Sequence, residues 1–143
     1  MCRRLNYKNF MDQTILPIRI LLVDDDPLFT KAMVDTLQGE GHQVTAASNG
    51  QAGIETFQAA LTGGNPFTLV ITDLGMSPVD GRQVITTVKT ISPTTPVILL
   101  TGWGEWFETT GGTPLKVDSI LAKPPKLREL RDALARCLEP GQA

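Results

Sequence analysis

Short runs of apolar residues alternate with longer amphipathic stretches along the 143-residue chain. Four runs are continuous enough for buried parallel strands, at residues 20–23, 69–71, 97–100 and 120–122, and a fifth strand is expected at Gln43–Ala47. Strands that alternate with helical stretches, punctuated by turn residues, are typical of a βα-repeated fold. The pattern therefore predicts an α/β protein with a parallel sheet.

The amphipathic stretches predict helices with recognisable ends. One begins near Pro27 and ends at Gly39, one is capped by Asn49 and closed by Gly63, one runs from Gly81 until Pro93, and the last covers residues 127–138. The apolar residues expected on the buried faces are Phe29, Met33, Leu37, Ile54, Phe57, Leu61, Val84, Ile85, Val88, Ile91, Leu127, Leu130, Leu134 and Leu138.

Polar residues stand where the strands end. Asp24, Asp25 and Asp26 follow the first strand, Asp73 ends the third, Thr101 the fourth, and Lys123 and Pro124 follow the fifth. Because the carboxyl ends of parallel strands meet at one edge of a sheet, these residues should share a crevice. Carboxylates bind hard divalent cations, whereas a hydroxyl and an ammonium bind phosphoryl oxygens. The pattern indicates an aspartate that accepts phosphate.

The acidic cluster requires a counter-charge. Two carboxylates about 4 Å apart repel each other by roughly 4 kcal/mol at an effective dielectric constant near 20. A magnesium ion would supply that charge at the predicted edge. Asp26 has two open interpretations, a helix cap or a member of the metal site. The lone histidine, His42, is expected to be a solvated turn residue.

Composition and charge narrow the class of protein. Hydrophobic residues make up 41% of the chain, which suits one domain with a real core. The net charge is -2 and the basic residues are dispersed, so we expect no direct contact with nucleic acid. No run is long enough to span a membrane, no signal peptide precedes the first strand, and Cys2 and Cys137 lack metal-ligand spacing. We expect a cytoplasmic protein that does not insert into membranes.

Four ordered motifs resemble the receiver domains of two-component response regulators. They are the segment 20–27 with its three aspartates, the segment 73–76 with Asp80-Gly81, the pair Thr101-Gly102 and the pair Lys123-Pro124. The similarity covers residues 18–139, between an N-terminal extension at 1–17 and a tail at 140–143. The resemblance implies a flavodoxin-like, doubly wound sheet of five parallel strands in the order 2-1-3-4-5.

The resemblance also implies a phosphoacceptor and a metal. Asp73 would take a phosphoryl group from a phosphohistidine on a histidine kinase or a phosphotransfer protein, and the phosphorylated domain would then act on a downstream protein. Magnesium would be bound directly by Asp25 and Asp73, through water by Asp24, and by the carbonyl of Gly75.

Further groups would contact the phosphoryl oxygens. By the same resemblance, these are the ammonium of Lys123, the hydroxyl of Thr101 and the backbone N–H groups of Leu74 and Gly102. Such a domain is not an enzyme in the usual sense, because it assists its own phosphorylation and dephosphorylation.

Several residues depart from the family pattern. Ser77-Pro78 moves the proline of the metal loop by one position, and Ile120 stands where receivers usually have a switching Tyr or Phe. Residues 109–114 fall where the fourth helix is expected, and their glycines and proline predict an irregular element. Trp103, Trp106 and Phe107 either pack over this loop or form a docking surface.

Alternative functions remain open at this point. The main interpretation is a stand-alone or excised receiver, and the second is the C-terminal receiver of a hybrid histidine kinase, since the tail ends soon after the last helix. A phosphatase with an Asp73 nucleophile is disfavoured, because Gly75 stands where its general acid would be. A flavin-binding module is disfavoured because an acidic edge repels phosphate. Met11 is a second candidate start residue.

Overall fold

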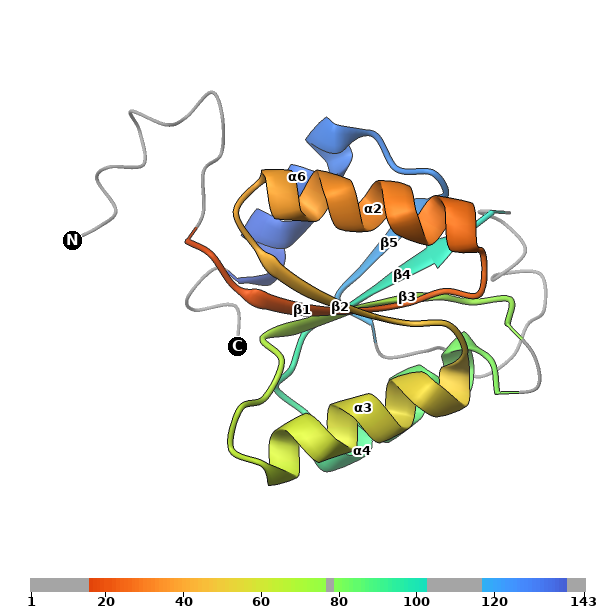
Figure 1. The fold of residues 1–143 in the computed structure, drawn as a ribbon, viewed down its shortest axis with the longest axis vertical. Helices are drawn as coiled ribbons and strands as arrows, with labels where there is room; N and C mark the ends of the chain where they lie inside the picture. Colours follow the sequence, from red (N-terminus) through yellow and green to blue (C-terminus); the bar gives the residue numbers. More distant parts are fainter. Residues whose placement is uncertain (1–15, 77–78, 103–116, 139–143) are drawn as a thin grey trace.

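A computed structural model describes residues 16–76, 79–102 and 117–138. Its elements are β1 (Arg19–Val23), α2 (Pro27–Gly39), β2 (Gln43–Ala47), α3 (Gly50–Thr62), β3 (Leu69–Asp73), α4 (Gly81–Ile91), β4 (Val97–Thr101), β5 (Ser119–Ala122) and α6 (Leu127–Cys137). All five strands are parallel and lie in the order β2-β1-β3-β4-β5 (Figure 1). The predicted fold class and strand order are confirmed.

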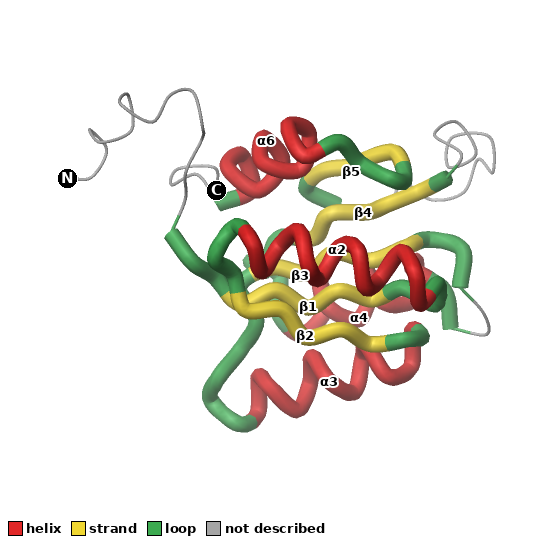
Figure 2. The backbone as a smooth tube through the Cα atoms, turned by 45° about the horizontal axis from the view of Figure 1, so that its top comes forward, coloured by secondary structure: helices red, strands yellow, loops and turns green. Residues whose placement is uncertain are grey.

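Helices cover both faces of the sheet. Helices α2 and α6 lie on one face and α3 and α4 on the other, as Figures 1 and 2 show. Side chains alternate along β1: Ile20 and Leu22 belong to the core cluster under α2 and α6, and Leu21 and Val23 to the cluster under α3 and α4. Continuous apolar strands are therefore buried on both faces, as the sequence predicts.

The burial predicted for β5 is wrong. Ile120 is 42% exposed and Ala122 is also exposed, whereas every residue of β3 and β4 is buried. The reason is that β5 is an edge strand, which among the described strands pairs with β4 alone. Leu121 packs against the cluster under α6, but its neighbours point to the opposite face, where the described helices give them less cover. An apolar run alone does not distinguish an edge strand from a central one.

The predicted helix starts are confirmed, but two of the residues predicted to face the core are exposed. Asp26, Asn49 and Asp80 each accept backbone N–H groups as N-caps. Ile91 and Leu127, predicted to face the core, are 38% and 40% exposed. Each is a terminal residue of its helix, and at these ends the apolar face of the helix extends past the part of the sheet that it covers.

His42 is buried rather than solvated. The residue is 5% exposed, and its Nδ1 accepts a hydrogen bond of 3.2 Å from the backbone N–H of Ile18. Gly41, at φ 98°, turns the chain so that β2 starts beside β1, and the imidazole meets Ile18, the residue before that strand. Burial lowers the pKa of His42, and the nearby charge of Glu40 offsets this only partly. A neutral imidazole is the form that can accept this bond.

Several predicted features lie outside the described residues. They are the irregular element at 109–114, the aromatic residues Trp103, Trp106 and Phe107, the pair Ser77-Pro78, and the candidate start Met11. Within the described ranges, no helix is long and apolar enough to cross a membrane.

Candidate functional site

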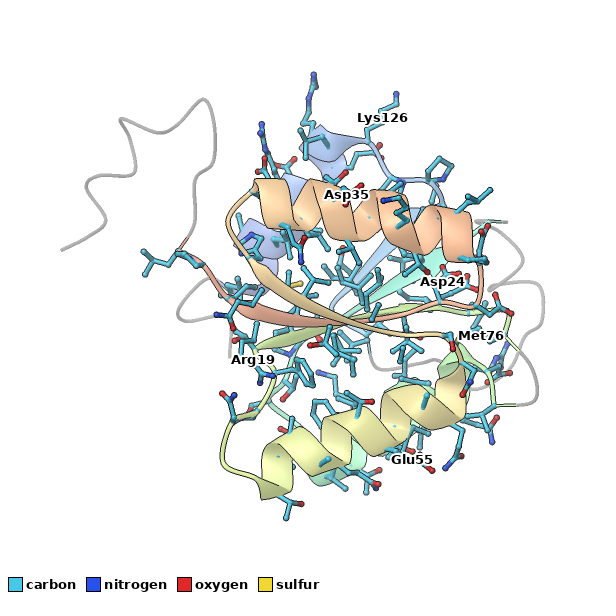
Figure 3. The ribbon with its side chains drawn as sticks, viewed as in Figure 1. Arg19, Asp24, Asp35, Glu55, Met76 and Lys126 are labelled. Atoms are coloured by element: carbon cyan, nitrogen blue, oxygen red, sulfur yellow. The ribbon has the colours of Figure 1, made fainter. Side chains whose placement is uncertain are left out.

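The carboxyl ends of the central strands meet at one edge of the sheet (Figure 2). The backbone N–H of Asp24 donates to the Ala47 carbonyl at 3.1 Å, and that of Lys123 donates to the Thr101 carbonyl at 3.0 Å. In Figure 3, Asp24 and Met76 lie toward this edge and Arg19 toward the opposite one. Parallel pairing thus brings distant residues together, as predicted.

These ends enclose a crevice of about 490 Å³. It is lined by Asp26, Phe29, Asp73, Leu74, Gly75, Thr101, Gly102, Lys123 and Pro124. Thr101 is 3% exposed and ends β4, so its position is fixed by the sheet. The predicted site residues Asp73, Thr101, Lys123 and Gly75 therefore share one cavity.

Three carboxylates lie beside this crevice. One oxygen from each of Asp24, Asp25 and Asp73 lies within 4.8 Å of the others. Asp24 and Asp73 are 1% and 7% exposed, whereas Asp25 is open to solvent. Asp24 Oδ1 is held by the backbone N–H of Asp26 at 2.8 Å. Such a set of oxygen donors, buried on one side and open on the other, fits a hard divalent cation that keeps several waters.

Lys123 provides one positive charge at the carboxylates. Its Nζ lies 2.8 Å from Asp24 Oδ2 and 3.6 Å from Asp73 Oδ1. Asp24 Oδ2 is fully buried and accepts no hydrogen bond of regular geometry from the described residues, so the ion pair is its main compensation. One ammonium against three carboxylates leaves an excess of two negative charges, which a divalent cation would balance.

The electrostatics of the site follow from this imbalance. Burial and the charge of Asp24 raise the pKa of Asp73, and the Lys123 ammonium only partly offsets them. Burial by itself would lower the pKa of Lys123, but its pairing with Asp24 and Asp73 outweighs burial and raises that pKa. Pairing thus favours the charged form of Lys123, whereas burial and the charge of Asp24 disfavour the ionised form of Asp73.

One predicted backbone donor is excluded. The N–H of Leu74 donates to the carbonyl of Leu100 at 3.1 Å, so it continues the β3–β4 ladder and does not point to a ligand. The sequence placed Leu74 after the strand, whereas the hydrogen bonding continues one residue further. Gly102 lines the crevice, and its role as a donor stays a prediction.

Of the two interpretations of Asp26, the structure supports the helix cap. Its Oδ1 accepts the N–H groups of Leu28 at 3.0 Å and Phe29 at 3.2 Å. The three-carboxylate cluster is made by Asp24, Asp25 and Asp73. Asp26 nonetheless lines the crevice and adds negative charge near Lys123.

Gly81 holds the loop that follows Asp73. Its N–H donates to the Leu74 carbonyl at 2.9 Å. A Cβ atom at Gly81 would lie 2.7 Å from Leu74 Cα and closer still to the Asp73 carbonyl oxygen. The start of α4 can therefore approach the end of β3, which carries Asp73, only with glycine at this position.

Phe29 belongs to the site, although the sequence suggested only core packing for it. Its ring centroid lies 4.6 Å from Lys123 Nζ, and the ring lines the crevice. The helical spacing of Phe29, Met33 and Leu37 carried the core prediction, and Phe29 does pack partly against that core. The sequence did contain one indication that Phe29 lies near the end of β1, because Phe29 follows the capping residue Asp26 by three positions.

The comparisons agree with this geometry. The family model described as the response regulator receiver domain matches residues 20–135. The transcriptional regulatory protein GlrR of Escherichia coli (strain K12) is 34% identical over 123 residues, which are 86% of this chain and 27% of GlrR. The chain thus spans about a quarter of that relative's length.

Two shorter proteins are similar over nearly their whole length. The response regulator receiver protein CpdR of Brucella abortus (strain 2308) is 28% identical over 84% of this chain and 96% of its own. The solved structure of Vibrio cholerae chemotaxis protein CheY4 superposes with a TM-score of 0.74 at 26% identity, covering 86% of this chain and all of that one. With the fold, the acidic crevice and the family match in agreement, this chain belongs to the response regulator receiver domains of two-component signalling.

Proposed function

We propose that Asp73 accepts a phosphoryl group from a phosphohistidine of a histidine kinase or phosphotransfer protein. The observation that carries this proposal is the position of its carboxylate, which lies at the end of the central strand, within 3.6 Å of Lys123 Nζ and grouped with Asp24 and Asp25. Asp73 is the member of this group that also lines the crevice. Membership of the family supports the same chemistry.

In the proposed transfer, a carboxylate oxygen of Asp73 forms a bond to phosphorus as the phosphorus–nitrogen bond of the donor breaks. The donor imidazole leaves with the electron pair of that bond. Lys123 and Thr101 contact the transferred oxygens and stabilise their charge. Because Lys123 already lies between two carboxylates, little rearrangement is required of it.

Magnesium is the cofactor that this donor set fits. Asp25 and Asp73 would bind it directly, Asp24 through water, and Gly75 through its carbonyl. Bound there, the ion supplies charge neutralisation for the phosphoryl oxygens. The excess of two negative charges over the Lys123 ammonium is the property of this chain that supports its binding.

Phosphorylation would change the binding of a downstream protein, in a cytoplasmic setting and without direct contact with nucleic acid. Ile120 lies on the exposed side of β5, where an aromatic switch residue is usual in the family. A branched aliphatic side chain cannot reproduce the rotation of an aromatic ring. The output of this receiver would therefore rely on other parts of the surface.

A stand-alone or excised receiver remains our main interpretation, and the C-terminal receiver of a hybrid kinase is the alternative. CpdR, which this chain matches over 96% of its length, supports the first. A phosphatase is the less favoured third candidate, because Gly75 offers no side chain as general acid.

Intact-mass measurement after incubation with acetyl phosphate and magnesium tests the proposal. We expect the mass gain of one phosphoryl group on the parent protein and none on Asp73→Asn. Asp26→Asn is the matched control, because it changes a neighbouring carboxylate that caps α2, and it should still gain the phosphoryl group. Labelling of another residue at a comparable rate in the parent would show that the acceptor is assigned wrongly.

A further inference from the structure

Lys123 has an uncharged partner that the sequence did not predict. The Phe29 ring lies against the ammonium, with 4.6 Å from Nζ to the ring centroid, inside the range of about 6 Å for a cation–π interaction. The Lys123 side chain is largely buried, so this contact is only weakly screened by water. An aromatic face attracts a cation without bearing a formal charge.

The first turn of α2 fixes where this ring lies. Pro27 occupies the first helical position, and Asp26 Oδ1 accepts the N–H of Phe29 at 3.2 Å. The capped turn begins immediately beyond the acidic end of β1. Phe29 is therefore anchored through its backbone next to the carboxylates that Lys123 also contacts.

The carboxylates that pair with Lys123 are also candidate ligands of a divalent cation. Asp24 and Asp73 pair with the ammonium, and both belong to the cluster that fits a divalent cation. A divalent cation bound there would attract the same carboxylates and repel the ammonium. The ring of Phe29 is not a metal ligand, so a cation would not compete for it.

We infer that Phe29 is a positioning residue that keeps the Lys123 ammonium in the crevice while the carboxylates are engaged by metal and phosphoryl group. The inference rests on the proposed function in two respects, namely that a divalent cation binds the carboxylates and that Lys123 contacts the phosphoryl oxygens. The simpler interpretation is that Phe29 only packs against the core under α2, a role that leucine could fill.

Three variants separate these roles. Phe29→Leu keeps apolar packing and removes the aromatic face, whereas Phe29→Tyr keeps the face. Phe67→Leu is the matched control, because it removes another cation–π contact, in which Arg19 Cζ lies 4.4 Å from the Phe67 ring centroid. Arg19 lies toward the opposite edge of the sheet from the crevice (Figure 3). If Phe29→Leu does not fold, as judged by circular dichroism, Phe29→Met replaces it.

The first measurement needs no phosphorylation. NMR order parameters of the lysine ε-methylene groups are recorded in the full chain, with and without magnesium, and the Lys123 signal among the six lysines is assigned with Lys123→Arg. With magnesium, we expect the order parameter of Lys123 to fall in Phe29→Leu toward that of the exposed Lys31, and to remain at the parent value in Phe29→Tyr and Phe67→Leu. An unchanged value in Phe29→Leu, or an equal fall in Phe67→Leu, would overturn the inference.

The second measurement asks whether positioning matters for phosphoryl binding. In the presence of magnesium, the affinity for beryllofluoride, a mimic of the phosphoryl group, should fall about three- to tenfold in Phe29→Leu and recover in Phe29→Tyr. The magnesium affinity should not change. Equal losses of both affinities would assign Phe29 a merely structural role. If the parent binds no beryllofluoride but the order parameters behave as expected, the proposed function fails while the positioning of Lys123 stands.

Discussion

At the scale of single residues, the negative charge of Asp73 in the crevice is unfavourable to folding. Asp73 is nearly fully buried, beside Asp24, and its pKa is raised by burial first and by Asp24 second. A raised pKa means that the folded state binds a proton more tightly than the unfolded state does. The stability associated with this proton is present at low pH and is lost as the pH rises through the raised pKa. Above the raised pKa, ionised Asp73 therefore lowers the free energy of unfolding.

Replacing this carboxylate should stabilise the protein. We expect Asp73→Asn to raise the melting temperature at pH 7 without magnesium by roughly 3–6 °C, the shift produced by about 1 kcal/mol in a domain of this size. Lys123 keeps its closer partner Asp24, so the variant leaves no unpaired ammonium. Thermal melts from pH 3 to pH 8 test this, and the difference should vanish at the acidic end, where Asp73 of the parent is protonated.

Asp35→Asn is the control for that experiment. Asp35 is an exposed residue of α2, paired with Lys31 at 3.8 Å, and surface pairs of this kind contribute little. Its melting temperature should follow that of the parent at every pH. A lower melting temperature for Asp73→Asn at pH 7 would contradict the proposed charge imbalance.

Magnesium affinity should distinguish the two aspartates that follow β1. We expect Asp25→Ala to weaken binding by about tenfold or more, and Asp24→Ala to weaken it less, because a direct ligand loses more than one acting through water. Asp24 also pairs with Lys123, so Asp24→Ala removes an ion-pair partner of the ammonium as well as one carboxylate of the cluster. Calorimetric titration measures both constants. Magnesium binding by Asp25→Ala that matches the parent would refute the proposed coordination.

At the scale of elements, close backbone contacts position the loop after β3. The N–H of Gly81 binds the Leu74 carbonyl, and the structure leaves no space for a side chain there. The amino end of α4 is thereby held against the strand that carries Asp73. Such a contact links the packing of α4 to the position of Asp73.

Gly81→Ala should therefore destabilise the protein by about 1–3 kcal/mol, the usual range for overpacking, and should slow phosphorylation. Gly39→Ala is the matched control, because Gly39 ends α2 with nothing within 4 Å of a built Cβ. Alanine there should be neutral or stabilising by up to about 1 kcal/mol. Urea unfolding measures both, and equal effects of the two substitutions would contradict the steric argument.

The elements themselves were predictable where the local signals are strong. Asp26-Pro27 and Asn49 mark helix starts by capping chemistry, and the structure has helices that begin there. Burial at the edges was less predictable. Ile120 and Leu127 look like core residues in a linear pattern, but their exposure depends on whether a neighbouring element covers them.

At the scale of the whole molecule, the N-terminal extension should be dispensable. The described part of the chain begins with exposed residues, Leu16 and Pro17, before β1. We expect a chain that starts at Met11 to melt within about 2 °C of the parent and to gain the phosphoryl group equally well. Thermal melts and intact mass test this. A large drop in melting temperature would show that Tyr7 or Phe10 packs on the body.

The boundaries of the domain remain a prediction at the same scale. We expect the receiver to occupy residues 18–139 between the extension at 1–17 and the tail at 140–143, and the family model matches the slightly shorter range 20–135. Limited proteolysis of the chain would locate both ends.

Local patterns in the sequence were enough to predict the class of fold, the strand order expected from the family resemblance, and the edge where Asp24, Asp73, Thr101 and Lys123 gather. It could do so because strand runs, capping residues and strand-end positions are local, and parallel connections bring the strand ends together.

The contact partners of these residues could be known only from the packed structure. It placed Lys123 closer to Asp24 than to Asp73, set the Phe29 ring against the ammonium, kept the Leu74 N–H in the sheet and buried His42. Such choices depend on distances of a few ångströms between segments far apart in the chain. Burial and charge pairing, which set the pKa values and the competition for Lys123, exist only once those segments are packed together.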